Sequence, residues 1–194
     1  MSIDLTATHL LFDGQTLLAA GSLSQVNEAY VQHFETAQGA AGTLVFEVAS
    51  GRQVDIDPTA SKHSLSPEAM VQSTPITGQS SRGRPKLGVV GREVTLLPRH
   101  WAWLETQRGG ASATLRRLVD EARLQNAEQD RVREAQDRTN RFLTALGGNL
   151  PGFEEAMRAL YAGDGARFVA ETKPWPNDLR QWANQLAKEA LGGD

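Results

Sequence analysis

Hydrophobic and polar residues follow a mixed strand and helix pattern in the first part of the chain. Residues 3–12 are rich in β-forming side chains and lead into Asp13-Gly14, a pair that favours a tight hairpin turn. Apolar residues at helical spacing then predict a helix over about 25–36, capped by Ser22 or Ser24.

Two further strands are predicted after this helix. Residues 43–48 form a short apolar run, and residues 53–57 alternate between polar and apolar side chains after a turn at Ser50-Gly51. The order strand, strand, helix, strand, strand predicts a small α+β domain over residues 1–60.

The pattern disappears between Pro58 and Arg84, where Ser, Thr, Pro, Gln and Gly dominate. Such a composition buries too little apolar surface to offset the entropy of folding. Residues 61–85 are therefore predicted to be a flexible linker between two units, because an uninterrupted loop of this length is uncommon inside one domain.

Regular patterns return after the linker. Residues 92–97 have the composition of a short strand, and Pro98 suits the first turn of a helix. Gly109-Gly110 is expected to end that helix, and Ser112 to cap the next one.

A long helical pattern follows and stops at Gly147-Gly148-Asn149. Three shorter helices are predicted beyond it, over residues 151–162, 165–172 and 178–191, with Asp164 as the cap of the second. The chain after the linker is thus divided into a strand-helix-helix unit, residues 86–127, and a C-terminal helical region, residues 128–194. The expected fold class of the whole chain is α+β.

The tryptophans carry separate expectations. Trp175 and Trp182 belong to the C-terminal helices and are expected in the core. Trp101 and Trp103 are two positions apart on a helix and cannot share one face, so one of them is expected to point into the core.

Positive charge is concentrated in one segment of this 194-residue chain, although the net charge is −3. Residues 82–117 carry eight Lys or Arg and two Asp or Glu, whereas residues 1–74 carry two basic and eight acidic residues. Such a cationic segment favours a polyanionic partner, for example a phosphate backbone.

Arg82-Gly83-Arg84-Pro85, at the start of this basic segment, has the composition of an AT-hook core. In such a motif the glycine lets the backbone enter a narrow minor groove, where the arginines meet the strong negative potential of A·T tracts. The alternative is a basic, solvated end of the linker, since four-residue matches arise easily by chance.

Residues 92–123 resemble the ribbon-helix-helix family of DNA-binding proteins. The resemblance rests on the strand ending at Leu97-Pro98, on a helix with Trp101 and Leu104, on the Gly109-Gly110 turn and on the run from Ser112 to Ala122. It implies a homodimer whose paired strands enter the major groove and whose second helices direct their N-termini at phosphates. The dimer core implied in this way consists of Val94, Leu96, Trp101, Leu104, Leu115, Leu118 and Val119.

The expected DNA contacts combine the basic segment with this resemblance, and they are Arg82, Gly83, Arg84, Lys86, Arg92, Thr95, Arg99, Ser112, Arg116 and Arg117. The strand departs from the family pattern, because neither of its faces is rich in residues that read base edges. Either the strand reads little sequence, or the unit keeps the family shape for dimerisation alone. A packing element that binds no nucleic acid is the third possibility.

Longer stretches resemble a bacterial family known only as domain of unknown function 2239. They include residues 50–57, 82–101, 109–123 and 149–164. The resemblance spans most of the chain and implies no activity.

The sequence contains few of the residue patterns that mark a catalytic or metal-binding site. The chain has no cysteine, which excludes disulfides, thiol catalysis and Cys-based metal sites. The four histidines lack ligand spacing, and neither a G-x-S-x-G elbow nor a P-loop is present. The pairs Asp55/Asp57 and Glu154/Glu155 are explained by a solvated strand face and by a helix N-terminus. We therefore expect a protein that is not an enzyme and holds no metal or other cofactor.

The expected function is DNA binding by a dimeric transcriptional regulator that contacts DNA through residues 82–117. The alternative is a non-catalytic interaction module in which the acidic N-terminal domain binds a protein partner, and a small-molecule enzyme ranks third. The absence of a secretory signal pattern and of an 18-residue apolar run leads us to expect a cytoplasmic location.

Overall fold

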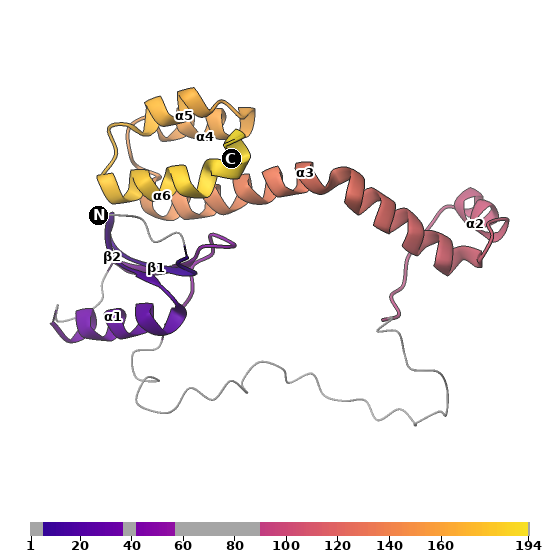
Figure 1. The fold of residues 1–194 in the computed structure, drawn as a ribbon, viewed down its shortest axis with the longest axis horizontal. Coiled ribbons are helices and arrows are strands. Elements are labelled where there is room, and N and C mark those ends of the chain that lie inside the picture. Colours follow the sequence, from indigo (N-terminus) through magenta and orange to yellow (C-terminus); the bar gives the residue numbers. More distant parts are fainter. Residues whose placement is uncertain (1–5, 37–41, 57–89, 194) are drawn as a thin grey trace, which may run out of the picture. The chain divides into compact units, whose positions relative to one another are not determined.

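The computed structural model describes residues 6–36, 42–56 and 90–193. By its internal contacts the chain divides into two compact units: unit 1 is residues 1–65 together with 127–194, and unit 2 is residues 66–126. The described residues combine one sheet with a larger set of helices (Figure 1), which confirms the predicted α+β class. The predicted linker lies outside the described residues, and so do the predicted DNA contacts Arg82, Gly83, Arg84 and Lys86.

Three antiparallel strands form the sheet of unit 1, in the order β2-β1-β3. β1 (His9–Asp13) and β2 (Thr16–Gly21) are joined through Gly14, whose φ of 54° lies in the left-handed region that favours glycine. This confirms the predicted hairpin. β3 (Thr43–Glu47) confirms the strand predicted over residues 43–48, and the structure shows that it pairs with the other edge of β1.

The predicted strand over residues 53–57 is wrong for the part that the structure describes. Gln53 makes a single isolated bridge with Phe46, and Asp57 lies outside the described residues. The alternating pattern has another cause: Val54 and Ile56 pack against a small apolar cluster, while Asp55 is exposed. Alternating polar and apolar residues indicate which side chains are buried, and here they occur in a segment that forms no ladder of strand hydrogen bonds.

Helix α1 (Leu23–Thr36) covers one face of the sheet (Figure 1). Its Val26 is buried together with Leu11 of β1 and Val45 of β3. Ser22 and Gln25 cap the helix reciprocally, because the Ser22 N–H donates to Gln25 Oε1 at 2.8 Å and the Gln25 N–H donates to Ser22 Oγ at 3.4 Å. Of the two predicted caps, Ser22 is the one used.

The C-terminal part of helix α3 (Gly110–Gly147) covers the opposite face of the sheet (Figure 1). The Phe142 ring makes edge-to-face contacts with Phe12 and Phe46, at centroid distances of 5.5 Å and 5.1 Å. Leu10 and Phe12 belong to this core, whereas the intervening Leu11 faces α1. A single core thus joins residues of the segments 1–60 and 128–194, which the sequence pattern predicts to be separate domains.

Three short helices complete this core, as predicted. They are α4 (Phe153–Ala162), α5 (Gly165–Thr172) and α6 (Asn177–Ala187), and a 3₁₀ turn, Lys188–Leu191, follows α6. Asp164 caps α5 by accepting a hydrogen bond from the Arg167 N–H at 3.0 Å. Trp175 and Trp182 are only 3% and 2% exposed, which confirms their expected place in the core. In the described part of the chain, every helix is too short or too polar to cross a lipid bilayer.

The turn after β3 lies directly against α3. Gly51 has a φ of 65°, and a Cβ at this position would lie 2.0 Å from the backbone oxygen of Arg138. Arg141 donates from Nη1 to the Ser50 carbonyl oxygen at 2.9 Å, and Arg138 pairs with Glu189 at 2.8 Å. One turn of α3 therefore holds both the sheet and the C-terminal end of the chain.

Replacing Gly51→Ala is expected to lower the free energy of unfolding by more than about 3 kcal/mol, because the left-handed conformation costs an alanine about 1–2 kcal/mol and the contact with α3 adds to it. Chemical denaturation monitored by circular dichroism measures the change. Gly14→Ala is the matched control, since Gly14 also has a positive φ but no atom within 4 Å of its Cβ position. Equal losses in the two variants would contradict the proposed close packing.

Replacing Phe142→Ala is expected to cost about 3–5 kcal/mol of stability, because the ring fills the space between the sheet and the helices. The exposed Phe34 of α1 provides the comparison, and Phe34→Ala is expected to cost less than about 1 kcal/mol. Thermal unfolding of both variants tests the assignment of the core, which is incorrect if Phe142→Ala unfolds at the wild-type temperature.

Candidate nucleic-acid interface

The described residues of unit 2 begin with an extended segment, residues 90–97. This segment forms no strand, so the strand predicted over 92–97 is wrong for the chain by itself. Leu97 does have extended dihedral angles, with φ −68° and ψ 150°. A strand requires a neighbour to accept and donate its backbone hydrogen bonds, and no described residue pairs with this segment. Arg92, Val94 and Thr95 are exposed, and Leu96 is half-buried.

Helix α2 (Pro98–Glu105) begins at the predicted proline, which occupies the first turn where its missing N–H costs no hydrogen bond. Its one buried residue is Leu104, at 2% exposure. Trp101 and Trp103 are 38% and 48% exposed, so the expectation that one of them points into the core is wrong. A helix of eight residues buries only a narrow face, and in α2 that face is occupied by Leu104.

Gly109 and Gly110 separate α2 from α3, as predicted, with φ values of 94° and 75°. Helix α3 already begins at Gly110, so Ser112 lies in its first turn and the predicted capping role is wrong. A glycine adopts the positive φ of this turn without strain, and the helix therefore starts three residues earlier than it would with Ser112 as its cap. Thr114, one turn further along, is buried.

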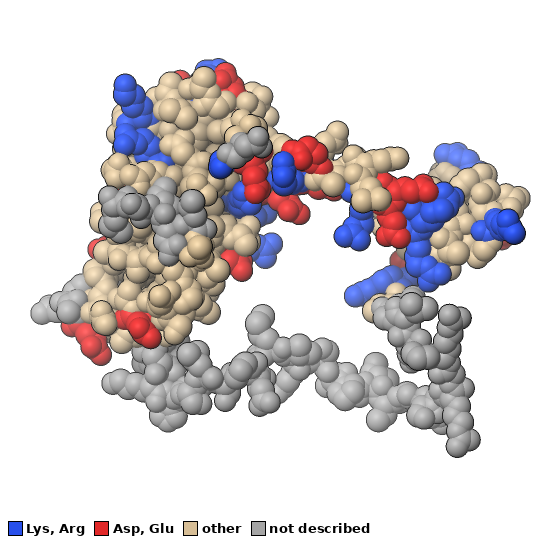
Figure 2. All heavy atoms as spheres, in the orientation of Figure 1, with Lys and Arg blue, Asp and Glu red and all other residues tan. Residues whose placement is uncertain are grey.

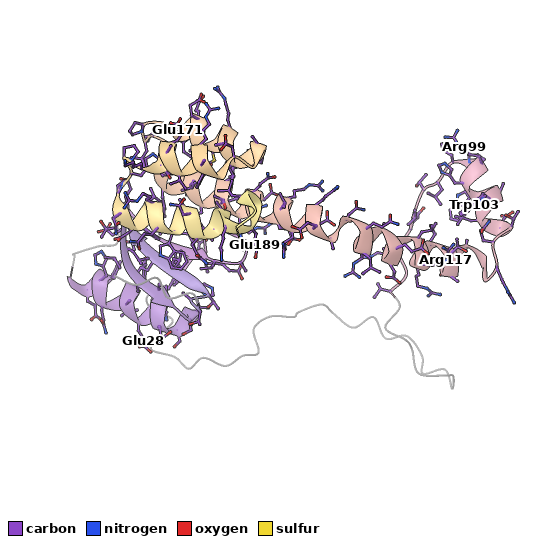
Figure 3. All side chains as sticks on the ribbon, turned by 45° about the horizontal axis from the view of Figure 1, so that its top comes forward. Glu28, Arg99, Trp103, Arg117, Glu171 and Glu189 are labelled. Atoms are coloured by element: carbon purple, nitrogen blue, oxygen red, sulfur yellow. The ribbon has the colours of Figure 1, made fainter. Side chains whose placement is uncertain are left out.

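The first turns of α3 carry the paired arginines of the predicted interface. Arg117 is bonded to Glu121 one turn later, with 2.8 Å between Nη1 and Oε1. Arg116 is exposed and forms no ion pair with any described residue. Arg116 shares a helix face with Ser112 and with Arg123, because these positions are separated by four and seven residues. Figure 3 marks Arg117 on α3 together with Arg99 and Trp103 on α2.

The arginines of the two units differ in what neutralises them. In unit 1, carboxylates pair with most of the described arginines, namely Arg131, Arg133, Arg138, Arg141, Arg158 and Arg167. In unit 2, Arg117 alone pairs with a described carboxylate, and Arg92, Arg99, Arg108, Arg116 and Arg123 do not. Figure 2 shows Lys and Arg side chains gathered over α2 and the start of α3. Unit 2 therefore presents guanidinium groups that are available to an external anion.

Two of these arginines, Arg108 and Arg123, are missing from the expected contacts. Arg108 lies within the basic segment, just before the glycine turn. Arg123 lies beyond the segment, but its spacing of seven residues from Arg116 places both on one helix face, and that spacing is the signal in the sequence that identifies it.

The remaining candidate chemistry of the described residues lies in unit 1. An open cavity of about 290 Å³ is lined by Glu47, Ser50, Arg52, Glu134, Asp137 and Arg141, among others. Its polar groups bond largely to one another: Arg141 pairs with Asp137 at 3.6 Å, and the Ser50 hydroxyl donates to Glu47. Among the described residues, no group of three or more His, Cys, Asp or Glu is arranged to hold a metal ion.

Unit 2 contains both the expected dimer core and those expected DNA contacts that the structure describes. The residues expected in the dimer core are Val94, Leu96, Trp101, Leu104, Leu115, Leu118 and Val119. The described residues expected to contact DNA are Arg92, Thr95, Arg99, Ser112, Arg116 and Arg117. Leu115 and Leu118 are half-buried, and Val94 and Val119 are exposed.

Comparison with known proteins gives one family and no further relative. The family model that matches covers residues 8–187 and describes an uncharacterised protein conserved in bacteria. No curated protein matches the chain, and no solved structure does. Because the match covers nearly all of the sequence, the chain belongs to the bacterial family known as domain of unknown function 2239.

Proposed function

We propose that this protein is a DNA-binding homodimer that regulates transcription without catalysing a reaction, and that unit 2 is its DNA-binding part. The observation that carries the proposal is the contrast in arginine pairing between the two units. Five described arginines of unit 2 have no described carboxylate partner, and the predicted AT-hook residues would add to the same basic segment.

Unpaired arginines favour a phosphate partner for a simple energetic reason. A guanidinium that already holds a carboxylate must break that bond before it binds a phosphate, whereas a solvated guanidinium exchanges only water and loosely held ions. Binding to DNA also releases the counterions condensed on the phosphates, which adds a favourable and salt-dependent term. Arg116 is therefore a better phosphate contact than Arg117, which Glu121 partly neutralises.

The proposed contacts position the protein on the backbone more than they read bases. Arg92, Arg99 and Arg116 are exposed cations of the kind that bind phosphate oxygens. Val94 and Leu96 of the extended segment lack the donors and acceptors that distinguish one base pair from another. We accordingly expect modest sequence preference.

A second copy is proposed because the described part of unit 2 has a very small core. Leu104 and Thr114 are its buried residues within 90–126, while Val94, Leu97 and Val119 remain exposed. Small units are only marginally stable when they bury little apolar surface, and association with a second copy buries more of it. Exposed apolar residues on neighbouring elements mark the surface that association would cover.

Arg116→Gln is expected to weaken duplex DNA binding about tenfold, a loss of about 1.4 kcal/mol, because one charge-assisted contact to phosphate is removed. Arg117→Gln, its neighbour on the same helix, is expected to lose only about threefold, because Glu121 already holds that side chain. Fluorescence anisotropy with a labelled duplex measures both affinities.

Arg158→Gln in α4 serves as the control for these two variants, since Arg158 is held by Glu155 in unit 1. Its affinity for the duplex is expected to equal that of the wild type. Identical affinities for all three variants would remove unit 2 from the proposed interface.

The homodimer is tested by sedimentation equilibrium at micromolar concentration, where the wild type is expected to have twice the chain mass. Val119→Asp places a charge on the exposed apolar surface of α3 and is expected to produce a monomer. Leu23→Asp changes a similarly exposed residue of α1 and is expected to leave the dimer intact. A monomeric wild type rules out the proposed association.

A further inference from the structure

Trp103 is the most exposed of the four tryptophans. Its exposed fraction is 48%, against 38% for Trp101 on the same helix, whereas Trp175 and Trp182 are almost completely buried. Within the described residues its ring makes no contact with another aromatic ring. A large apolar ring left in water is unfavourable for the chain alone, and such rings commonly mark surfaces that bind a partner.

The main chain at Trp103 is firmly held although its ring is exposed. The Thr106 hydroxyl donates to the Trp103 carbonyl oxygen at 2.7 Å, and the Gln107 side-chain amide donates to the same oxygen at 3.3 Å. The adjacent Leu104 is buried and fixes the rotation of α2. The helix that presents the ring is therefore ordered before any partner arrives, which lowers the entropic cost of binding.

A cation stands next to this ring. Arg99 and Trp103 are four residues apart on α2 and so occupy one helix face, with about 5–6 Å between their Cβ atoms. Arg99 is exposed and has no described carboxylate partner. An aromatic face and an unpaired guanidinium at this spacing match two neighbouring parts of one nucleotide, its base and its phosphate.

We infer that Trp103 is a platform on which an unpaired base stacks, that Arg99 binds the adjacent phosphate, and that single-stranded DNA is therefore the preferred ligand of unit 2. This inference rests on the proposed function, because it requires DNA to bind at unit 2. It goes further by naming the form of the DNA.

Two arguments favour a single strand over a duplex at this face. A duplex hides the faces of its bases in the stack, whereas an unpaired base exposes a face that an aromatic side chain can cover. Stacking also tolerates any base, which suits a unit whose extended segment offers few groups that read base edges.

Charge argues against a second copy of the chain at the same place. Packing two copies through the Trp103 face would also bury two Arg99 side chains, neither of which is paired with a described carboxylate of its own chain. A strand of DNA supplies the missing negative charge together with an apolar surface for the ring.

Intrinsic tryptophan fluorescence of the full chain provides the test. Thymidine oligonucleotides are expected to quench the emission of the exposed tryptophans, while buried Trp175 and Trp182 supply a constant background. An adenine-thymine duplex of the same length is expected to bind more weakly and to quench little.

Three variants separate stacking from a structural role. Trp103→Leu is expected to lose about tenfold in affinity for the single strand, whereas Trp103→Phe, which retains an aromatic face, is expected to lose about threefold or less. Tyr161→Leu changes an aromatic residue of α4 with similar exposure and is expected to bind as the wild type does. Affinities are measured by anisotropy of a labelled oligonucleotide, and circular dichroism confirms that each variant is folded.

The outcomes distinguish this inference from the proposed function. The inference is supported if the single strand binds more tightly than the duplex, and if Trp103→Leu loses affinity for the single strand that Trp103→Phe largely retains. Binding of the duplex without quenching by the single strand, or equal affinities of Trp103→Leu and Trp103→Phe, overturns it and leaves DNA binding intact. No binding of either form overturns both.

Discussion

The packing of Phe142 against Phe12 and Phe46 is the contact on which unit 1 depends. It brings a helix from the second half of the chain onto a sheet from the first, and the close approach of Gly51 to Arg138 fixes the same junction at its edge. Helix α1 packs on one face of the sheet and α3 on the other, so both faces of the central strand β1 are buried. The short helices α4, α5 and α6 then complete one continuous core.

The two units differ in how many of their described arginines are paired with carboxylates. Arginines of unit 1 are largely bonded to carboxylates of the same unit, including a network in which Glu155 holds both Arg158 and Arg167. Surface pairs of this kind contribute little to stability, but they leave few unneutralised cations. In unit 2 the same residue type is mostly unpaired among the described residues. Arginine charge that is not neutralised within the unit, next to an exposed tryptophan, is the physical basis for the proposal that unit 2 binds DNA.

The sequence predicts local elements well where a local cause exists. The hairpin at Gly14, the caps at Ser22 and Asp164, and the helix started by Pro98 each follow from the chemistry of one or two residues. The sequence predicts less well where an element depends on tertiary contacts. The alternation at Val54 and Ile56 arises from packing against an apolar cluster, and the composition of 92–97 suits a strand that has no described neighbour. The exposure of both Trp101 and Trp103 depends on how little of α2 is covered, which periodicity cannot reveal. The sequence shows the positive charge of the segment. Only the structure shows that Arg117 is paired with Glu121 and that Arg116 has no described carboxylate partner.

The salt dependence of DNA binding tests the central claim most directly. If unpaired arginines of unit 2 neutralise phosphates, the logarithm of the binding constant should fall linearly with the logarithm of salt concentration. Four to five contacts per chain predict a slope of about −4 on duplex DNA and about −3 on a single strand, for each bound chain. Binding that is absent at low salt, or that stays constant between low and moderate salt, would contradict the assignment of these arginines to a phosphate backbone.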